Sequence, residues 1–273
     1  MKTKRILALV LTFTMIFTLT ACSKAEDKYF RVGMECDYAP FNWTQAEASD
    51  TSVPIEGGVG FADGYDVQIA KQMADALGKE LVVVKTEWDG LPMSLTSGSI
   101  DAIIAGMSPT EERKATIDFT DIYWASDMCI VVKKDGAYAN ATSLADFSGA
   151  KLTGQLNTSH YEVLDQITGV DKQAAMESFP QMIVALTSGS IDGYTCETPS
   201  ALSATAANKD LTYIKFEKGK GFDIDVASVS CAIGLKKGSD ITKKLNKALA
   251  KISEETRQQM MSDAVDRQPL SAE

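Results

Sequence analysis

Apolar and polar positions first alternate and then change to a helical period in the first part of the chain. Residues 30–34 (FRVGM) place an apolar side chain at every second position, which is typical of a strand. Residues 66–77 (DVQIAKQMADAL) have apolar side chains at helical spacing, with Asp66 suited to cap the helix and Gly78 to end it. Residues 81–85 (LVVVK) are typical of a buried strand. Strand, helix and strand in this order predict a parallel sheet and an α/β fold.

The heptapeptide LTSGSID occurs twice, at residues 95–101 and 186–192. In both copies the pattern predicts a helix that ends at a glycine, Gly98 or Gly189, followed by a strand. A repeat array would need more copies at a shorter period. Two copies instead predict two similar halves with something held between them. We expect the heptapeptide itself to reflect shared local geometry and not to contact a ligand.

Polar residues suited to binding follow the first of these strands, at the sheet edge where α/β proteins bind ligands. In residues 106–113 (GMSPTEER), Ser108 and Glu111 match a capping box, and Arg113 lies one turn into the predicted helix. Free N–H groups at a helix start and a guanidinium together suit a carboxylate. An ordinary capped helix with a surface arginine is the alternative.

Further candidates lie where other predicted elements begin or end. Glu197 follows the second heptapeptide copy and could hold an ammonium group, although a solvated loop residue is the alternative. Ser159 begins a second capping-box pattern (SHYE) that contains His160, the only histidine. A single histidine without metal-ligand spacing predicts no metal site. Tyr38 and Trp88 each follow a strand and either belong to the core or sandwich an apolar stem or a cation.

The chain begins with MKTKR and a 14-residue apolar segment, residues 6–19. A membrane span needs about 20 such residues, whereas this length is typical of a signal-peptide core. The next residues, up to Cys22, resemble the lipobox of bacterial lipoproteins. We therefore predict a signal peptide at residues 1–21, a lipidated Cys22 and a tether at residues 22–28; an ordinary secretory signal is the alternative. One acyl chain anchors weakly, so two or three are expected.

Composition and charge narrow the range of partners. Residues 1–21 hold three of the 27 Lys and Arg residues and none of the 37 Asp and Glu residues, so the remaining chain has a formal charge of −13. Nucleic acid needs a basic patch, and none is expected as a partner. The spacing of the cysteines cannot pair them, and disulfides and small buried hydrophobes are equally plausible. Besides Cys22 they are Cys36, Cys129, Cys196 and Cys231.

A series of motifs covers nearly the whole chain after the signal, in order. It comprises DYAPF (37–41), GYDVQIA (64–70), WDGLPMSLTSGSIDAIIAGMSPTEER (88–113), DFTDIYW (118–124), QLNTSHYEVL (155–164), SGSIDGYTCETP (188–199) and AIGLKKGSDITKKLNKALAKI (232–252). The series resembles the extracellular amino-acid-binding proteins of bacterial ABC importers, solute-binding family 3. The resemblance implies a Venus-flytrap fold of the type II periplasmic binding proteins, with two α/β lobes joined by two hinge crossings. Lobe one would comprise residues 29–127 plus 231–273, and lobe two residues 130–228.

The resemblance also implies a binding site for the ligand's α-carboxylate. Arg113 matches the arginine that clamps this group in the family. Gly106 and Ser108 match its backbone and hydroxyl partners. Thr158 and Ser159 match a helix start in lobe two that also meets the carboxylate. Where many relatives have glycine this chain has Asn157, which tolerates the same left-handed backbone, so little consequence is expected.

The rest of the ligand has its own matching positions. Glu197 matches the acid that takes the α-ammonium, which is often Asp in the family and here is one methylene longer. Tyr38 and Trp88 match positions that flank the ligand side chain, and Glu35 matches an acidic position near its far end. Two further pocket-lining positions of varied type are Gln155 and His160.

The expected function is that of a monomeric, lipid-anchored receptor on the extracellular face of the cell membrane. It would capture a free amino acid and deliver it, without a cofactor, to an ABC permease and its ATPase. Glu35 beside Tyr38 and Trp88 favours lysine or arginine; glutamine or another polar amino acid is the alternative, because an acid also accepts from an amide. A lyase on the same fold and an amino-acid sensor are rival classes. No enzyme motif such as GxSxG or HExxH supports the lyase.

Overall fold

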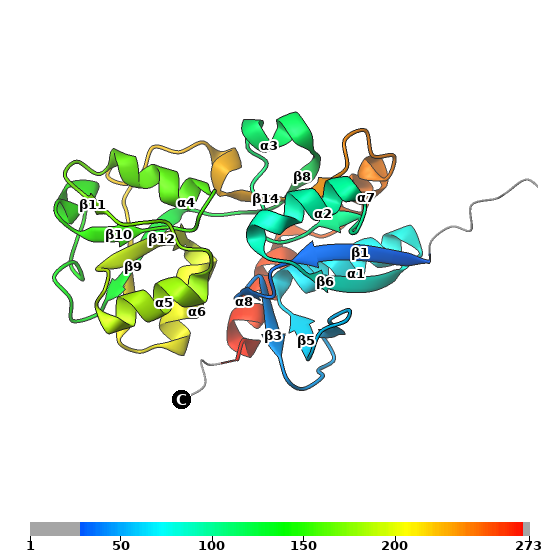
Figure 1. Ribbon diagram of the computed structural model, residues 1–273, viewed down its shortest axis with the longest axis horizontal. Coiled ribbons are helices and arrows are strands. Elements are labelled where there is room, and N and C mark those ends of the chain that lie inside the picture. The colour runs from blue at the N-terminus through cyan, green and yellow to red at the C-terminus, as the bar shows by residue number, and fades with distance from the viewer. Residues whose placement is uncertain (1–27, 270–273) are drawn as a thin grey trace, which may run out of the picture.

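The computed structural model describes residues 28–269, which form two α/β lobes beside each other (Figure 1). The predicted signal peptide, Cys22 and the tether up to residue 27 lie outside the described residues, as do residues 270–273. Within residues 28–269, no helix has the length and apolar character that a membrane crossing requires.

Lobe one is built on a five-stranded sheet. Its strands, in spatial order, are β6 (Glu80–Lys85), β1 (Tyr29–Met34), β7 (Ala102–Ile103), β14 (Ser230–Leu235) and β8 (Asp118–Ala125). The first three are parallel, and β14 runs antiparallel to both of its neighbours. The helices are α1 (Tyr65–Leu77), α2 (Leu91–Ser97), α3 (Glu111–Thr116), α7 (Thr242–Leu249) and α8 (Glu254–Arg267). A small antiparallel sheet contains β2 (Asp37–Tyr38), β3 (Asn42–Gln45), β5 (Phe61–Asp63) and β4 (Val53–Pro54).

Lobe two repeats this plan. Its strands, in spatial order, are β11 (Asp171–Lys172), β10 (Lys151–Thr153), β12 (Gly193–Glu197), β9 (Met128–Lys133) and β13 (Leu211–Lys215). Again the first three are parallel and the fourth is antiparallel to both of its neighbours. The helices are α4 (Ser159–Glu162), α5 (Phe179–Ser188) and α6 (Thr198–Ala207). Short 3-10 helices lie at Trp88–Gly90 in lobe one and at Leu144–Phe147, Val163–Gln166 and Val226–Val229.

The two heptapeptide copies occupy equivalent places in the two lobes. Gly98 ends α2 and Gly189 ends α5, both with left-handed backbones (φ 87° and 82°). The terminal aspartate then bonds to the first parallel strand: the Asp101 carboxylate accepts from the N–H of Arg31 at 2.8 Å, and Asp192 accepts from that of Lys151 at 2.9 Å. The shared spelling therefore encodes the same helix end and the same strand entry twice.

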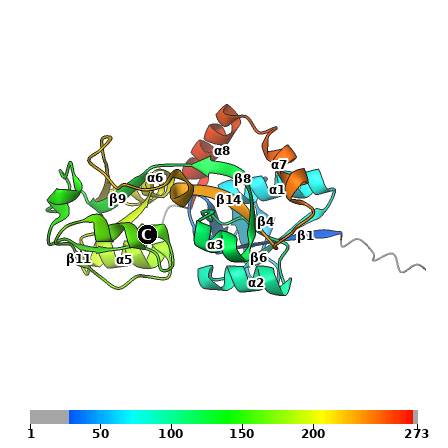
Figure 2. The same cartoon turned by 90° about the horizontal axis from the view of Figure 1, so that it is seen from above.

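The chain passes between the lobes at two places. It leaves the lobe-one sheet after Ala125 and enters the lobe-two sheet at Met128, and it returns between Lys215 and Ser230. Both crossings lie along one side of the molecule, where β8, β9 and β14 meet in the view from above (Figure 2). We propose lobe boundaries at these crossings.

Three helix caps differ from the prediction. Asp66 does not cap α1, which begins after Gly64; its side chain turns inward and accepts from the Tyr123 hydroxyl and the Asn42 amide. Ser108 does not cap α3, because that helix starts later and Thr110 is its N-cap. Ser159 is the first residue of α4 and not its cap. In each case a tertiary partner, and not the local helix end, takes the polar side chain.

Candidate functional site

Residues from both lobes meet at the carbonyl of Ser228, in the returning hinge segment. The Ser108 hydroxyl from lobe one donates to this carbonyl at 3.1 Å, and the Ser159 hydroxyl from lobe two donates to it at 2.7 Å. Thr158, just before Ser159, is buried and donates to the carbonyl of Gln155. The two predicted helix starts are therefore brought together across the lobes.

Arg113 reaches across the same junction from α3. Its guanidinium donates to the carbonyl of Ser108 at 3.0 Å and to that of Asn157 in lobe two at 2.9 Å. The guanidinium carbon also lies 5.1 Å from the centre of the Trp88 ring, within the range of a cation–π contact. Asn157 has the left-handed backbone that its position requires (φ 56°). Arg113 therefore bridges the two lobes, and its role towards a carboxylate stays a prediction.

Glu197 ends β12 and is buried, with 4% of its surface exposed. One carboxylate oxygen accepts from the Tyr38 hydroxyl at 2.5 Å and from the Ser200 hydroxyl, and the other lies 2.9 Å from Nε2 of His160. Burial alone would raise the pKa of Glu197, but the bonds and charge of His160, with the two hydroxyls, lower it. The residue is therefore a buried carboxylate held in its charged form, and the alternative of a solvated loop residue is wrong.

Tyr38 lies in an aromatic stack that joins the lobes. Its ring centre is 5.0 Å from that of Phe41 and 4.5 Å from that of Phe179, the first residue of α5. A Cβ atom at position 106 would lie 2.7 Å from the Tyr38 ring, so only glycine at this position leaves room for the ring. The Gly106 N–H donates to the Tyr123 hydroxyl. Tyr38 thus adjoins Glu197, whereas Trp88 adjoins Arg113. Sequence reasoning missed Phe179.

Glu35 is a buried acid of lobe one whose side chain contacts lobe two. It is 4% exposed; one carboxylate oxygen accepts from the Gln155 amide at 3.0 Å, and the other is buried without a hydrogen-bond partner in residues 28–269. Burial raises the pKa of Glu35 well above its ordinary value, and the charges of Asp37, Glu87 and Asp89 add to this effect. No positive group pairs with Glu35 within residues 28–269, and burying an unpaired charge costs free energy of folding.

A cavity of about 170 Å³ lies between the lobes beside these groups. Lobe one contributes Glu87, Trp88 and Asp89, and lobe two contributes Leu156 and Glu177. Gln155 connects the lining of this cavity to Glu35, because its side-chain amide donates both to Glu35 and, at 3.1 Å, to the carbonyl of Glu177. The lining of this small space thus includes three acidic residues, all of them exposed, and one aromatic residue. Sequence reasoning missed all three, although Glu87 and Asp89 flank the predicted Trp88.

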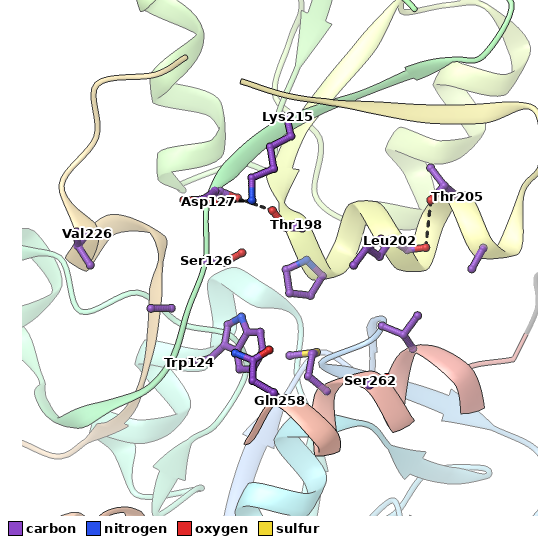
Figure 3. Close-up of a pocket in the computed structure, with 15 residues that line it drawn as sticks. Trp124, Ser126, Asp127, Thr198, Leu202, Thr205, Lys215, Val226, Gln258 and Ser262 are labelled. Atoms are coloured by element: carbon purple, nitrogen blue, oxygen red, sulfur yellow. Dashed lines mark hydrogen bonds and ion pairs between the residues drawn. The ribbon is translucent and has the colours of Figure 1, made fainter. Parts of the chain in front are cut away.

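A larger cavity of about 800 Å³ lies against the outgoing hinge segment, between α6 and α8 (Figure 3). Its lining is mostly apolar, with Trp124, Leu202 and Met261, and its charged groups, Asp127 and Lys215, pair with each other at 2.8 Å. None of the predicted site residues lines it. It lacks the convergent charges that a small zwitterion needs, so the site between the lobes is the better candidate. Across residues 28–269, no cluster of His, Cys, Asp and Glu is arranged to hold a metal ion.

Comparisons with known proteins show similarity along most of the chain. The model of the bacterial extracellular solute-binding proteins, family 3, matches residues 30–264. The arginine-binding extracellular protein ArtP of Bacillus subtilis is 28% identical over 92% of this chain and 93% of its own length. The L-cystine-binding protein TcyJ of Escherichia coli is 30% identical over 85% and 80%. An amino acid ABC transporter substrate-binding protein from Streptococcus pneumoniae, solved bound to L-arginine, has a TM-score of 0.73 at 25% identity, covering 88% of this chain and 95% of its own.

Proposed function

Because the chain belongs to the bacterial extracellular solute-binding proteins of family 3, we propose that it captures a cationic L-amino acid, arginine or lysine. The amino acid is bound between the two lobes and is delivered to the permease and ATPase of an ABC importer. The observation that carries the choice of ligand is the buried Glu35 carboxylate, which has one oxygen without a partner in residues 28–269.

Electrostatics favour a positive side chain at this end of the site. Glu87 and Asp89 of lobe one and Glu177 of lobe two line the cavity next to Glu35. These like charges lie around one cavity and repel each other, less strongly where solvent screens them. A guanidinium or ammonium among them offsets this repulsion and supplies the missing partner of Glu35, whereas an apolar side chain does neither.

The groups shared by all amino acids are recognised nearer the hinge. Arg113, with Gly106, Ser108, Thr158 and Ser159, binds the α-carboxylate. Glu197 binds the α-ammonium. Tyr38 and Trp88 contact the methylenes, and Gln155 and His160 line the walls. The ligand then contacts both lobes at once, and such contacts stabilise the closed arrangement.

The family and the lipobox-like residues before Cys22 support the proposed location. Solute-binding proteins of this family are extracellular or periplasmic, and we propose that lipidation of Cys22 holds a monomer at the outer face of the membrane. The ligand is released unchanged, and no cofactor is involved.

Glutamine is a second candidate, and one contact favours it. The Gln155 side-chain amide donates to Glu35 at 3.0 Å, so this carboxylate already accepts from an amide of the chain itself. A glutamine ligand presents the same group. It would leave the repulsion among the neighbouring carboxylates uncompensated, which is why the cationic ligand ranks first.

A thermal-shift screen of residues 23–273 against the twenty amino acids tests the proposal. The protein is first unfolded and refolded to remove carried-over ligand. At 100 times its dissociation constant a ligand stabilises the folded state by about 2.7 kcal/mol. We expect arginine or lysine to raise the melting temperature most and to be recovered unchanged. A shift with glutamine alone supports the second candidate, and a melting temperature that no amino acid moves contradicts both.

A further inference from the structure

Cys129 and Cys196 face each other on neighbouring strands of lobe two. They are register partners in the antiparallel pair of β9 and β12, and their Sγ atoms lie 3.9 Å apart. Both side chains are fully buried and both thiols are free. The Cys129 thiol donates to the carbonyl of Cys196 at 3.3 Å. Opposed residues of antiparallel strands have Cα atoms about 4.5–5.5 Å apart, and disulfides span about 4.4–6.8 Å. The usual spacing of paired strands therefore falls within the range that a disulfide spans.

We infer that Cys129 and Cys196 are joined by a disulfide in the extracellular protein. The oxidant is a small-molecule disulfide. The thiolate of one cysteine attacks it, a mixed disulfide forms and the first small thiol leaves. The second cysteine thiolate then attacks the mixed disulfide, the Cys129–Cys196 bond forms and the second small thiol leaves. The cysteines lose two electrons and two protons, and the two small thiols gain them.

The surroundings determine when this exchange takes place. Thiolates, and not thiols, carry out the attack. Burial raises the pKa of Cys196 well above its ordinary value, and neither side chain is exposed in the folded lobe. The bond therefore forms while β9 and β12 are still accessible to small disulfides, and folding then shields it from reductants. Extracellular proteins meet the oxidising conditions in which such bonds persist.

The bond has a structural consequence near the binding site. It links two residues 67 positions apart, so it restricts the unfolded chain strongly. Cys196 directly precedes Glu197, and the next N–H, of Thr198, donates to the carbonyl of Asp127 in the outgoing hinge segment. The disulfide therefore fixes the end of β12 to the strand by which the chain enters lobe two.

Peptide mapping of the full chain tests the inference without any ligand. The chain is refolded with oxidised and reduced glutathione, denatured in acid, alkylated with iodoacetamide at neutral pH in denaturant and digested without reduction. We expect the peptides of Cys129 and Cys196 to be recovered as one linked species, two hydrogen masses below their sum. Cys36, whose sulfur contacts the carbonyl of Met34, should be alkylated. Recovery of Cys129 and Cys196 as separate alkylated peptides, or linked to other cysteines, overturns the inference.

Thermal unfolding gives a second test. Reductant present during refolding should lower the melting temperature of the natural chain by at least about 5 °C. The double variant Cys129→Ser, Cys196→Ser is the control and should melt at one temperature with or without reductant. An equal effect of reductant on both proteins also contradicts the inference. Because neither test uses an amino acid, failure of the proposed function leaves both results interpretable.

Discussion

Nε2 of His160 lies 2.9 Å from Oε2 of Glu197, at the place proposed for the ligand's α-ammonium. The other oxygen of Glu197 already accepts from Tyr38 and Ser200. A carboxylate oxygen offers about two acceptor positions, so Oε2 has one position left beside the imidazole. The α-ammonium of a ligand must therefore bind next to His160 or displace it.

The first prediction is that arginine binds more weakly at pH 5.5 than at pH 8, because burial raises the pKa of Glu35 well above its ordinary value. The charges of Asp37, Glu87 and Asp89 raise this pKa further. A protonated Glu35 has no charge to pair with the guanidinium of the ligand. Affinity should thus rise with pH, as measured by isothermal titration calorimetry.

Glu35→Gln is the matched variant for this experiment, because its side chain has nearly the same shape and cannot titrate. Its affinity for arginine should vary less with pH than that of the natural chain. An unchanged pH dependence in Glu35→Gln would mean that another group causes the effect, and it would contradict the prediction.

The second prediction concerns the choice of ligand. Glu35→Gln should weaken arginine or lysine binding by about 100-fold or more, because removing one partner of a buried charge pair costs about 3–5 kcal/mol. Glutamine binding should change by less than about tenfold, because only one neutral hydrogen bond is altered. The control is Glu217→Gln, an exposed residue paired with Lys220. Equal losses for cationic and neutral ligands would show that Glu35 does not pair with a charge.

The strands, the two glycine-ended helices and the strand-end position of Glu197 could be predicted because each depends on local sequence. Val32 is buried as the alternation implies, and Gly98 ends its helix as expected. The caps predicted at Ser108 and Ser159 do not form, because both hydroxyls donate to the carbonyl of Ser228, a contact distant in sequence that the local pattern does not contain.

The three acidic residues that line the small cavity were missed for a similar reason. Glu87 and Asp89 are ordinary polar loop residues in the sequence, and Glu177 precedes a helix 88 or more positions away. Only the approach of the two lobes places them around one cavity. Phe179 was missed for the same reason: it stacks on Tyr38 across the two lobes, and such a contact produces no periodic pattern in the sequence. Contacts across the crevice are therefore the part of the site that sequence patterns do not contain.

The third prediction concerns the guanidinium at the junction of the lobes. Arg113→Lys should weaken every amino acid ligand by about 10- to 100-fold, because lysine cannot replace a planar, two-pronged donor. The losses for arginine, lysine and glutamine should be equal within about threefold, since the α-carboxylate is common to all of them. Arg257→Lys is the control: this arginine also donates to backbone carbonyls, but within lobe one. Losses that depend strongly on the side chain of the ligand would place Arg113 elsewhere in the site.

The fourth prediction concerns stability, and it follows from the buried Asp66. This carboxyl is fully buried, and burial raises its pKa to about 7 although the Tyr123 hydroxyl and the Asn42 amide donate to it. A folded-state pKa above the unfolded value means that the folded protein binds the proton more tightly, so Asp66 lowers stability as the pH rises from about 4 to about 7. The penalty reaches on the order of 4 kcal/mol above pH 7.

Asp66→Asn cannot titrate. Urea unfolding at pH 4.5 and pH 7.5 should therefore show a smaller loss of stability in the variant than in the natural chain, whatever its absolute stability. Parallel losses in the two proteins would mean that Asp66 keeps one charge state over this range.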